Sequence, residues 1–90
     1  MTKFMVERTF HVTEDQMEFV GRRSNEVVRD QYPEITWHHS HVVVQDDGKV
    51  RTYCIYEAPT PEAIRRTAKA NGLPVDRITE VQMVDPYVYV

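Results

Sequence analysis

The first clear pattern in the chain is an alternation of apolar and polar positions over Lys3–Phe10. Phe4, Val6 and Phe10 share one parity, and Glu7 has the other. Successive side chains of a strand point to opposite sides of its sheet, so a period of two is typical of a strand with one buried face. We therefore predict a half-buried strand here, with Glu7 on its open side.

Helical spacing replaces this alternation over about residues 14–31. Thr13 and Gln16 have the spacing of a capping box at the start of the predicted helix. Tyr32-Pro33 ends it, because proline disfavours helical geometry in the residue before it. The apolar positions that define the spacing are Met17, Val20, Val27 and Val28.

Two β-rich runs then flank a turn signal in the middle of the chain. They cover about residues 35–45 and 50–58, and Asp46-Asp47-Gly48 separates them. A three-residue loop built on a type I turn, with Gly48 in the left-handed conformation, fits this signal. The sequence thus predicts an antiparallel hairpin.

A second helix is predicted to follow the hairpin. Thr60 can cap it, and Pro61 suits its first position. Gly72 is placed to end it in the left-handed conformation, and residues 77–84 are predicted to form the last strand. The inward stripe of this helix consists of Ala63, Ile64, Thr67 and Ala68.

The resulting order is strand, helix, strand, strand, helix, strand. This is the α+β arrangement of the ferredoxin-like fold, βαββαβ, with a four-stranded antiparallel sheet and two helices on one face. We expect a single domain over residues 1–90. A chain of 90 residues cannot cover the second face of such a sheet, so we expect a homodimer that pairs sheet against sheet. The alternating tail, residues 85–90, is predicted to be a strand that reaches across to the partner.

Composition narrows the class of protein. Lys and Arg total 11 against 14 Asp and Glu, for a net charge of −3, so we expect no nucleic-acid partner. Charged residues interrupt the apolar ones early in the chain, which is typical of neither a signal peptide nor a membrane span. The single cysteine, Cys54, rules out an internal disulfide and suits a reducing compartment. We therefore expect a cytoplasmic protein without a membrane partner.

Three of the four histidines lie within Trp37–His41. In the register of the three-residue loop, His38 opposes Tyr56 on the side of the helices, while His39 and His41 point to the open face of the sheet. A two-residue loop would shift the pairing by one and set His39 beside Cys54 and Tyr56 instead. In the first register the open face carries Glu7, Trp37, His39, His41, Val43, Arg51, Tyr53, Ile55 and Glu57.

His39 and His41 form a candidate metal site. Imidazole is a good ligand for nickel, zinc and copper, and residues two apart on a strand project from the same side, about 7 Å apart. One ion could bridge the two rings, with Glu57 or Glu7 as an oxygen ligand and water or the partner subunit completing the set. The alternative is that the two histidines are exposed or interfacial polar residues without a metal.

Several short motifs are similar to those of one known group. They are Glu7-Arg8-Thr9-Phe10, Trp37-x-His39-Ser40, Asp46-Asp47, Tyr53-Cys54-x-Tyr56-Glu57-Ala58-Pro59, Glu62-Ala63-Ile64-Arg65 and Gly72-Leu73-Pro74-x-Asp76-Arg77-Ile78. With them the chain resembles a family of small ferredoxin-like bacterial proteins described as a domain of unknown function and as nickel-binding or nickel-responsive. The resemblance implies a homodimer that binds a divalent metal, nickel first, and it implies no reaction. The pattern is matched at His39, Ser40, Cys54, Tyr56 and Glu57, whereas His38 and His41 stand where an apolar residue and a tyrosine are more usual.

Two other functions use the same residues. Paired subunits can enclose a pocket for proton-transfer or oxidative chemistry on a small carbonyl or aromatic compound. For proton transfer, His39 would act as base, Tyr53 or Tyr56 as donor and Glu57 as orienting carboxylate. A binding or regulatory module could use the same pocket for a small molecule without chemistry. We assign no catalytic residue, and we expect Cys54 to be a small buried residue rather than a soft metal ligand. The expected pocket residues are Trp37, Ser40, Tyr53, Cys54 and Tyr56.

Overall fold

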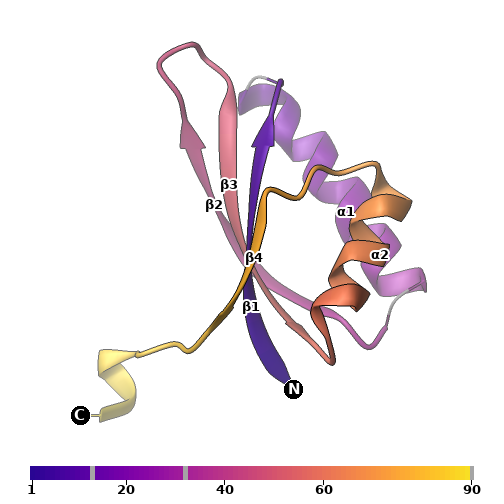
Figure 1. Ribbon diagram of the computed structural model, residues 1–90. Coiled ribbons are helices and arrows are strands. Elements are labelled where there is room, and N and C mark those ends of the chain that lie inside the picture. Colours follow the sequence, from indigo (N-terminus) through magenta and orange to yellow (C-terminus); the bar gives the residue numbers. More distant parts are fainter. Residues whose placement is uncertain (13, 32, 90) are drawn as a thin grey trace.

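The computed structural model describes residues 1–12, 14–31 and 33–89. Its strands pair antiparallel in the order β2-β3-β1-β4, which is the ferredoxin-like topology. Both long helices lie on the same face of this sheet, so the opposite, open face has no helix over it (Figure 1). The elements are β1 (Thr2–Phe10), η1 (Glu14–Gln16), α1 (Met17–Gln31), β2 (Thr36–Val44), β3 (Val50–Ala58), α2 (Pro61–Asn71), β4 (Arg77–Val81) and η2 (Pro86–Tyr89).

The core lies between the sheet and the helices, where the alternation of β1 places it. Val6 and Val50 are fully buried, and Phe4 is nearly so. The predicted inward stripe of α2 is also confirmed, because all four of its residues are buried. The core is thus one layer thick, and residues of the other parity on β1 and β3 remain on the open face.

The hairpin has the predicted three-residue loop. Gln45 N–H donates to Lys49 O at 2.7 Å, and Gly48 N–H donates to Gln45 O at 2.9 Å. Gly48 has φ 84°, a left-handed conformation that glycine adopts at no steric cost. Val44 therefore opposes Val50, as predicted.

The predicted pairing of His38 with Tyr56 is wrong. The ladder between β2 and β3 shifts between Trp37 and His39, so Trp37, not His38, opposes Tyr56. The extra residue turns Trp37 from the open face to the helix side, where its ring stacks on Tyr56 at 6.4 Å between centroids. Burying the large indole there outweighs the regular ladder, and His38 is the bulged residue that allows it.

The ends of α2 are those that the sequence predicts. Thr60 Oγ1 accepts a hydrogen bond from Ala63 N–H at 3.2 Å, which satisfies one free donor of the first turn. Gly72 ends the helix with φ 66°. Leu73 N–H then donates to Ala68 O, the closing bond that such a helix end requires.

Other boundaries differ from the predictions. The first helix begins with a 3-10 turn, η1, before α1, while the predicted cap Thr13 lies outside the described residues. The last strand ends at Val81 rather than 84, because its pairing with β1 ends where Val81 meets Lys3. In one copy of the chain, the described tail residues 86–89 form a 3-10 turn rather than a strand, and the predicted reach of the tail to a partner stays a prediction. Asp85 Oδ1 accepts a hydrogen bond from Tyr87 N–H at 2.9 Å and starts the 3-10 turn η2.

None of the described helices is long and apolar enough to cross a membrane.

Candidate functional site

His39 and His41 lie side by side on the open face, as predicted. Their ring centroids are 5.2 Å apart with the planes at 85°. Both residues are exposed, and their ladder partners on β3 are Ile55 and Tyr53. Two imidazoles bound to one ion at about 2.0–2.1 Å have ring centres roughly 4.5–6.5 Å apart, so this pair has a spacing that a shared ion requires.

The two predicted carboxylate ligands face the same side but contact cations. Glu57 Oε1 lies 3.5 Å from Lys3 Nζ and 3.5 Å from His38 Nε2. Because His38 contacts Glu57, the bulge adds a third imidazole to the open face. Among the side chains that the structure describes, no three of the His, Cys, Asp or Glu type form a group that could hold a metal ion.

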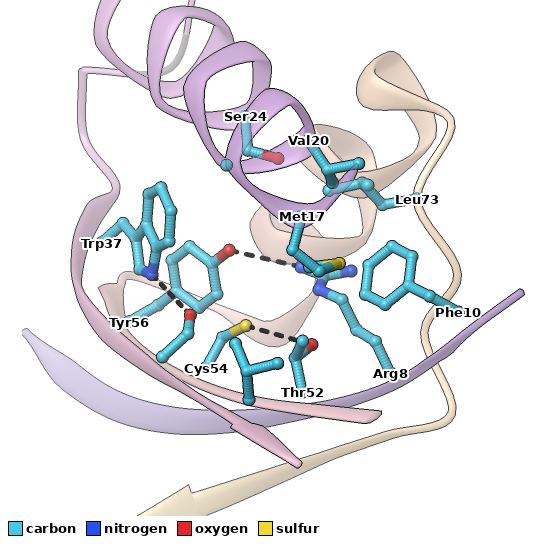
Figure 2. A pocket seen from close by; sticks show the side chains of 13 residues that line it. Arg8, Phe10, Met17, Val20, Ser24, Trp37, Thr52, Cys54, Tyr56 and Leu73 are labelled. Atoms are coloured by element: carbon cyan, nitrogen blue, oxygen red, sulfur yellow. Dashed lines mark hydrogen bonds between the residues drawn. The ribbon is translucent and has the colours of Figure 1, made fainter. Parts of the chain in front are cut away.

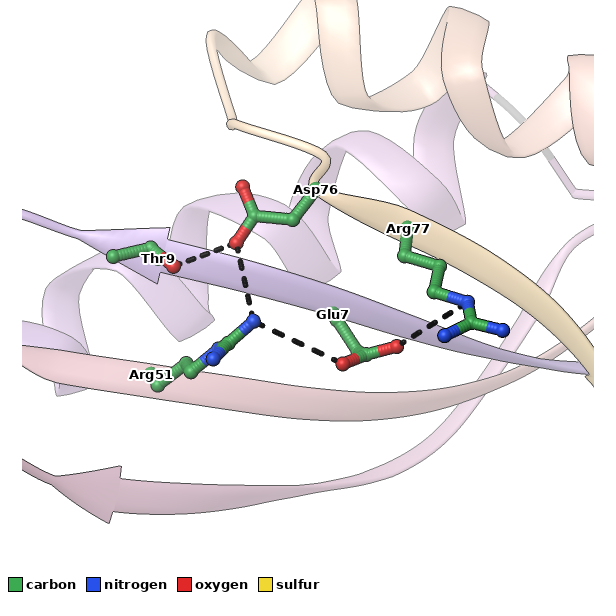
Figure 3. A network of polar contacts seen from close by, with 5 residues as sticks. All are labelled: Glu7, Thr9, Arg51, Asp76 and Arg77. Carbon is green, nitrogen blue, oxygen red and sulfur yellow. Dashed lines mark hydrogen bonds and ion pairs between the residues drawn. The ribbon is translucent and has the colours of Figure 1, made fainter.

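Glu7 belongs to a charged network on the open face (Figure 3), and Tyr53 separates it from His41 in the same cross-strand row. Its carboxylate lies 3.9 Å from Arg51 Nη2 and 4.0 Å from Arg77 Nε. Arg51 also reaches Asp76 at 3.9 Å, and Thr9 Oγ1 donates to Asp76 Oδ2 at 2.6 Å. The network links three strands and the segment before β4, and this gives Glu7 a structural role in one copy of the chain.

One chain contains a cavity on the opposite side of the sheet from the histidines, and the predicted pocket between paired subunits stays a prediction. A cavity of about 230 Å³ lies between the sheet and α1, and we call it the helix-side cavity. Figure 2 shows Tyr56 and Cys54 rising into it from β3 and Ser24 and Val20 facing it from α1. Four of the five predicted pocket residues line it, namely Trp37, Ser40, Cys54 and Tyr56.

Tyr53 is the predicted pocket residue that lies elsewhere. It is on the open face, where Arg51 Cζ lies 5.8 Å from its ring centroid. The sheet also separates His39 from Tyr56, since one faces outward and the other faces the helices. These two side chains therefore do not meet around one substrate within a single chain, and of the two tyrosines only Tyr53 shares a face with His39.

Arg8 is the residue of the helix-side cavity that the sequence analysis missed. Its side chain is only 3% exposed. Nη1 donates to Pro74 O at 2.7 Å, and Nη2 donates to Tyr56 Oη at 3.4 Å. The signal was in the sequence, because Arg8 has the parity of Phe4 and Val6 in an otherwise apolar row, and a charge on a buried parity indicates a specific role.

These surroundings raise the pKa of the Tyr56 phenol. Burial raises the pKa of Tyr56 because the charged phenolate is disfavoured away from water, and the Arg8 guanidinium partly opposes this effect. The Cys54 thiol, which donates to Thr52 Oγ1 at 3.6 Å, acts in the same direction as burial. Tyr56 is therefore a neutral hydrogen-bonding group of the cavity wall across the physiological pH range.

The raised pKa of Tyr56 predicts that the free energy of unfolding depends on pH. The folded chain holds the phenolic proton more tightly than the unfolded chain, so the free energy of unfolding should fall as the pH rises above about 10. Tyr56→Phe should flatten this fall by at most about 1.4 kcal/mol per pH unit, the linkage of one proton. Urea unfolding at several pH values between about 9 and 11.5 measures the slope. Tyr53→Phe, on the other face of β3, is the control, and identical slopes for Tyr56→Phe and wild type would contradict the prediction.

A family model for nickel-responsive proteins, described as SCO4226-like, matches residues 4–81. The chain belongs to the SCO4226-like family. The match runs from the third residue of β1 to the end of β4 and includes α1, α2, the histidine pair and the walls of the helix-side cavity. A comparison with curated protein sequences found no significant match.

Solved structures support the fold of this SCO4226-like protein. The crystal structure of SCO4226 from Streptomyces coelicolor A3(2) has a TM-score of 0.71 at 24% identity, covering 92% of this chain and 99% of that one. A de novo designed protein with a ferredoxin fold has a TM-score of 0.60 at 22% identity, covering 94% and 89%. The C-terminal domain of MgtC from Mycobacterium tuberculosis has a TM-score of 0.58 at 13% identity, covering 89% and 85%. At these identities the structures show the ferredoxin-like fold alone.

Proposed function

We propose that this protein is a homodimer that binds a divalent transition metal, with nickel first and zinc second, through His39 and His41 on the open face. The single observation that carries the proposal is the pair of exposed imidazoles with ring centroids 5.2 Å apart. Imidazole is a ligand that suits nickel and zinc, and the family is described as nickel-responsive.

A second copy of the chain would complete the ligand set. One chain supplies two imidazoles, and two ligands are fewer than structural or catalytic metal sites use. Glu57 and Glu7 lie on the same face. Each would supply an oxygen ligand by giving up its ion pair, with Lys3 for Glu57 and with Arg51 for Glu7. Pairing two open faces would bring the remaining ligands from the partner's copy of this surface.

An exposed apolar residue of the open face favours such a pairing. Val43, the ladder partner of Arg51, is 43% exposed on the open face of the edge strand β2, whereas Val42 and Val44 point to the helix side. Natural proteins usually protect an exposed apolar edge, because it invites pairing with another chain. A partner that covers this part of the sheet would remove the exposure and would lie close to His41.

Calorimetric titration with nickel and zinc tests the proposal on metal-free, tag-free protein. We expect nickel to bind with Kd below about 100 μM, and zinc to bind at the same site. The His11→Ala variant is the control, because His11 is an exposed histidine beyond the end of β1 and should not change the affinity. If neither metal binds more tightly than about 100 μM, the proposed function is wrong.

A further inference from the structure

The helix-side cavity contains a buried cation, Arg8, which has no carboxylate partner among the described side chains. Among the residues whose side chains the structure describes, no carboxylate lies within ion-pair distance of Arg8, and its guanidinium donates instead to the neutral oxygens of Pro74 and Tyr56. The Tyr56 ring lies 5.9 Å from Arg8 Cζ and adds a weak cation–π contact. Burying a charge is costly unless an opposite charge or several good hydrogen bonds compensate it, so this arrangement favours an anion.

The rest of the cavity is suited to an apolar body. Its walls include Phe10, Met17, Val20, Trp37 and Leu73. Tyr56 brings its ring to the same space, stacked on Trp37. The volume of about 230 Å³ lies between that of an engineered apolar cavity that takes up benzene, about 150 Å³, and that of pockets for drug-sized ligands, which begin near 300 Å³. A ligand with about eight to ten non-hydrogen atoms matches this size.

The charge of the site selects among anions. Arg8 is the single basic residue among the described residues that line the cavity, so a singly charged group is favoured over a phosphate. A guanidinium also presents parallel N–H groups that match a planar carboxylate. Among described residues, the polar groups that line the cavity besides Arg8 and Tyr56 are the small side chains of Ser24, Ser40, Thr52 and Cys54, which suit a compact ligand.

We propose that the helix-side cavity binds a small monocarboxylate with a compact cyclic or branched apolar body. The carboxylate lies on the guanidinium of Arg8, and the apolar body lies under α1 between Trp37 and Phe10 (Figure 2). This site uses the helix side of the sheet, whereas His39 and His41 are on the open face. It does not rest on metal binding.

Trp37 offers a direct measurement, because it is the single tryptophan of the chain and lines the cavity. We expect cyclohexanecarboxylate, which does not absorb where tryptophan is excited, to change the fluorescence of metal-free protein saturably, with Kd at or below about 1 mM. Cyclohexanecarboxamide, the neutral analogue of the same shape, should bind at least about tenfold more weakly, because it lacks the charge that pairs with Arg8. Absence of saturable binding, equal affinity for acid and amide, or tighter binding of inorganic phosphate would overturn the proposal.

Variants locate the ligand. Arg8→Met should weaken binding of the acid at least about tenfold and leave binding of the amide within about threefold. Gly21→Leu tests the location independently of Arg8, since leucine favours a helix more than glycine does. A Cβ at Gly21 would lie 3.7 Å from Trp37 Cη2, an ordinary contact, so Gly21→Ala should retain the cavity while Gly21→Leu fills it.

The expected pattern is therefore specific. Gly21→Leu should bind neither the acid nor the amide, whereas the affinity of Gly21→Ala for each should stay within about threefold of wild type. The His39→Ala, His41→Ala double variant should bind the acid as wild type does, which separates this proposal from the metal site. Unchanged affinity for the acid in folded Arg8→Met or Gly21→Leu protein, judged by circular dichroism, would overturn the proposal.

Discussion

Replacing both His39 and His41 by alanine is expected to weaken nickel binding by at least about 100-fold. Loss of residues that only support a metal ligand typically costs 10- to 100-fold in affinity, and removal of two direct ligands should cost more. The rings are exposed and their centroids lie 5.2 Å apart, so their removal takes away the pair without opening the core. Calorimetric titration of the variant and of wild type measures the change.

The matched control for this variant is His38→Ala. His38 is the bulged residue beside the pair, and its Nε2 lies 3.5 Å from Glu57 Oε1. The His38→Ala variant removes an imidazole from the same strand and face. We expect the nickel affinity of this variant to stay within about threefold of wild type. If the double variant keeps its affinity for nickel, His39 and His41 are not the ligands, even where the protein binds the metal.

Replacing Ile55 by glutamate is expected to convert the proposed dimer into a monomer at micromolar concentration and thereby to reduce nickel binding. Ile55 is the ladder partner of both His39 and Met5, which places it in the middle of the open face, and it is 9% exposed. In a dimer that pairs open faces, two glutamates would approach each other, and juxtaposed like charges cost several kcal/mol. Sedimentation velocity measures the oligomeric state.

The control for Ile55→Glu is Phe19→Glu. Phe19 is 72% exposed on α1, on the opposite side of the sheet. The Phe19→Glu variant also replaces an apolar residue by an acidic one, and we expect the proposed dimer to persist in it. A wild-type protein that sediments as a monomer, or an Ile55→Glu variant that remains a dimer, would contradict the open-face pairing.

The sequence predicted the fold well because its signals are local. Asp46-Asp47-Gly48 fixed the loop length and with it the pairing of Val44 with Val50. Thr60 and Gly72 marked the ends of α2 through a side-chain oxygen and a left-handed backbone. Each of these signals depends on a few neighbouring residues and needs no knowledge of the rest of the chain.

The bulge at His38 could not be predicted in the same way. Regular alternation through Trp37-His38-His39 is locally acceptable, and no glycine or proline interrupts it. The shift depends on what lies across the core, since Trp37 gains Tyr56 as a stacking partner and donates to Ser40 Oγ at 2.9 Å. Tertiary packing therefore decided which face each residue of the cluster occupies.

The bulge also changes the interpretation of the expected pocket. Regular alternation predicts Trp37 with His39 and His41 on the open face, and His38 with Tyr56 on the helix side. The structure instead has His38, His39 and His41 on the open face and Trp37 with Tyr56 at the helix-side cavity. A protein with a metal on one face and a carboxylate under α1 would have two binding sites joined by the shared strands β2 and β3.

Anomalous scattering at the nickel edge from crystals of nickel-loaded protein tests metal binding by His39 and His41 most directly. We expect an anomalous peak bound by ring nitrogens of His39 and His41, on the open face, with further ligands from a second copy of the chain. Data at the zinc edge from zinc-loaded crystals should place a peak at the same position. A nickel ion bound by other residues, or nickel-saturated crystals in which these two imidazoles hold no metal, would contradict metal binding by His39 and His41.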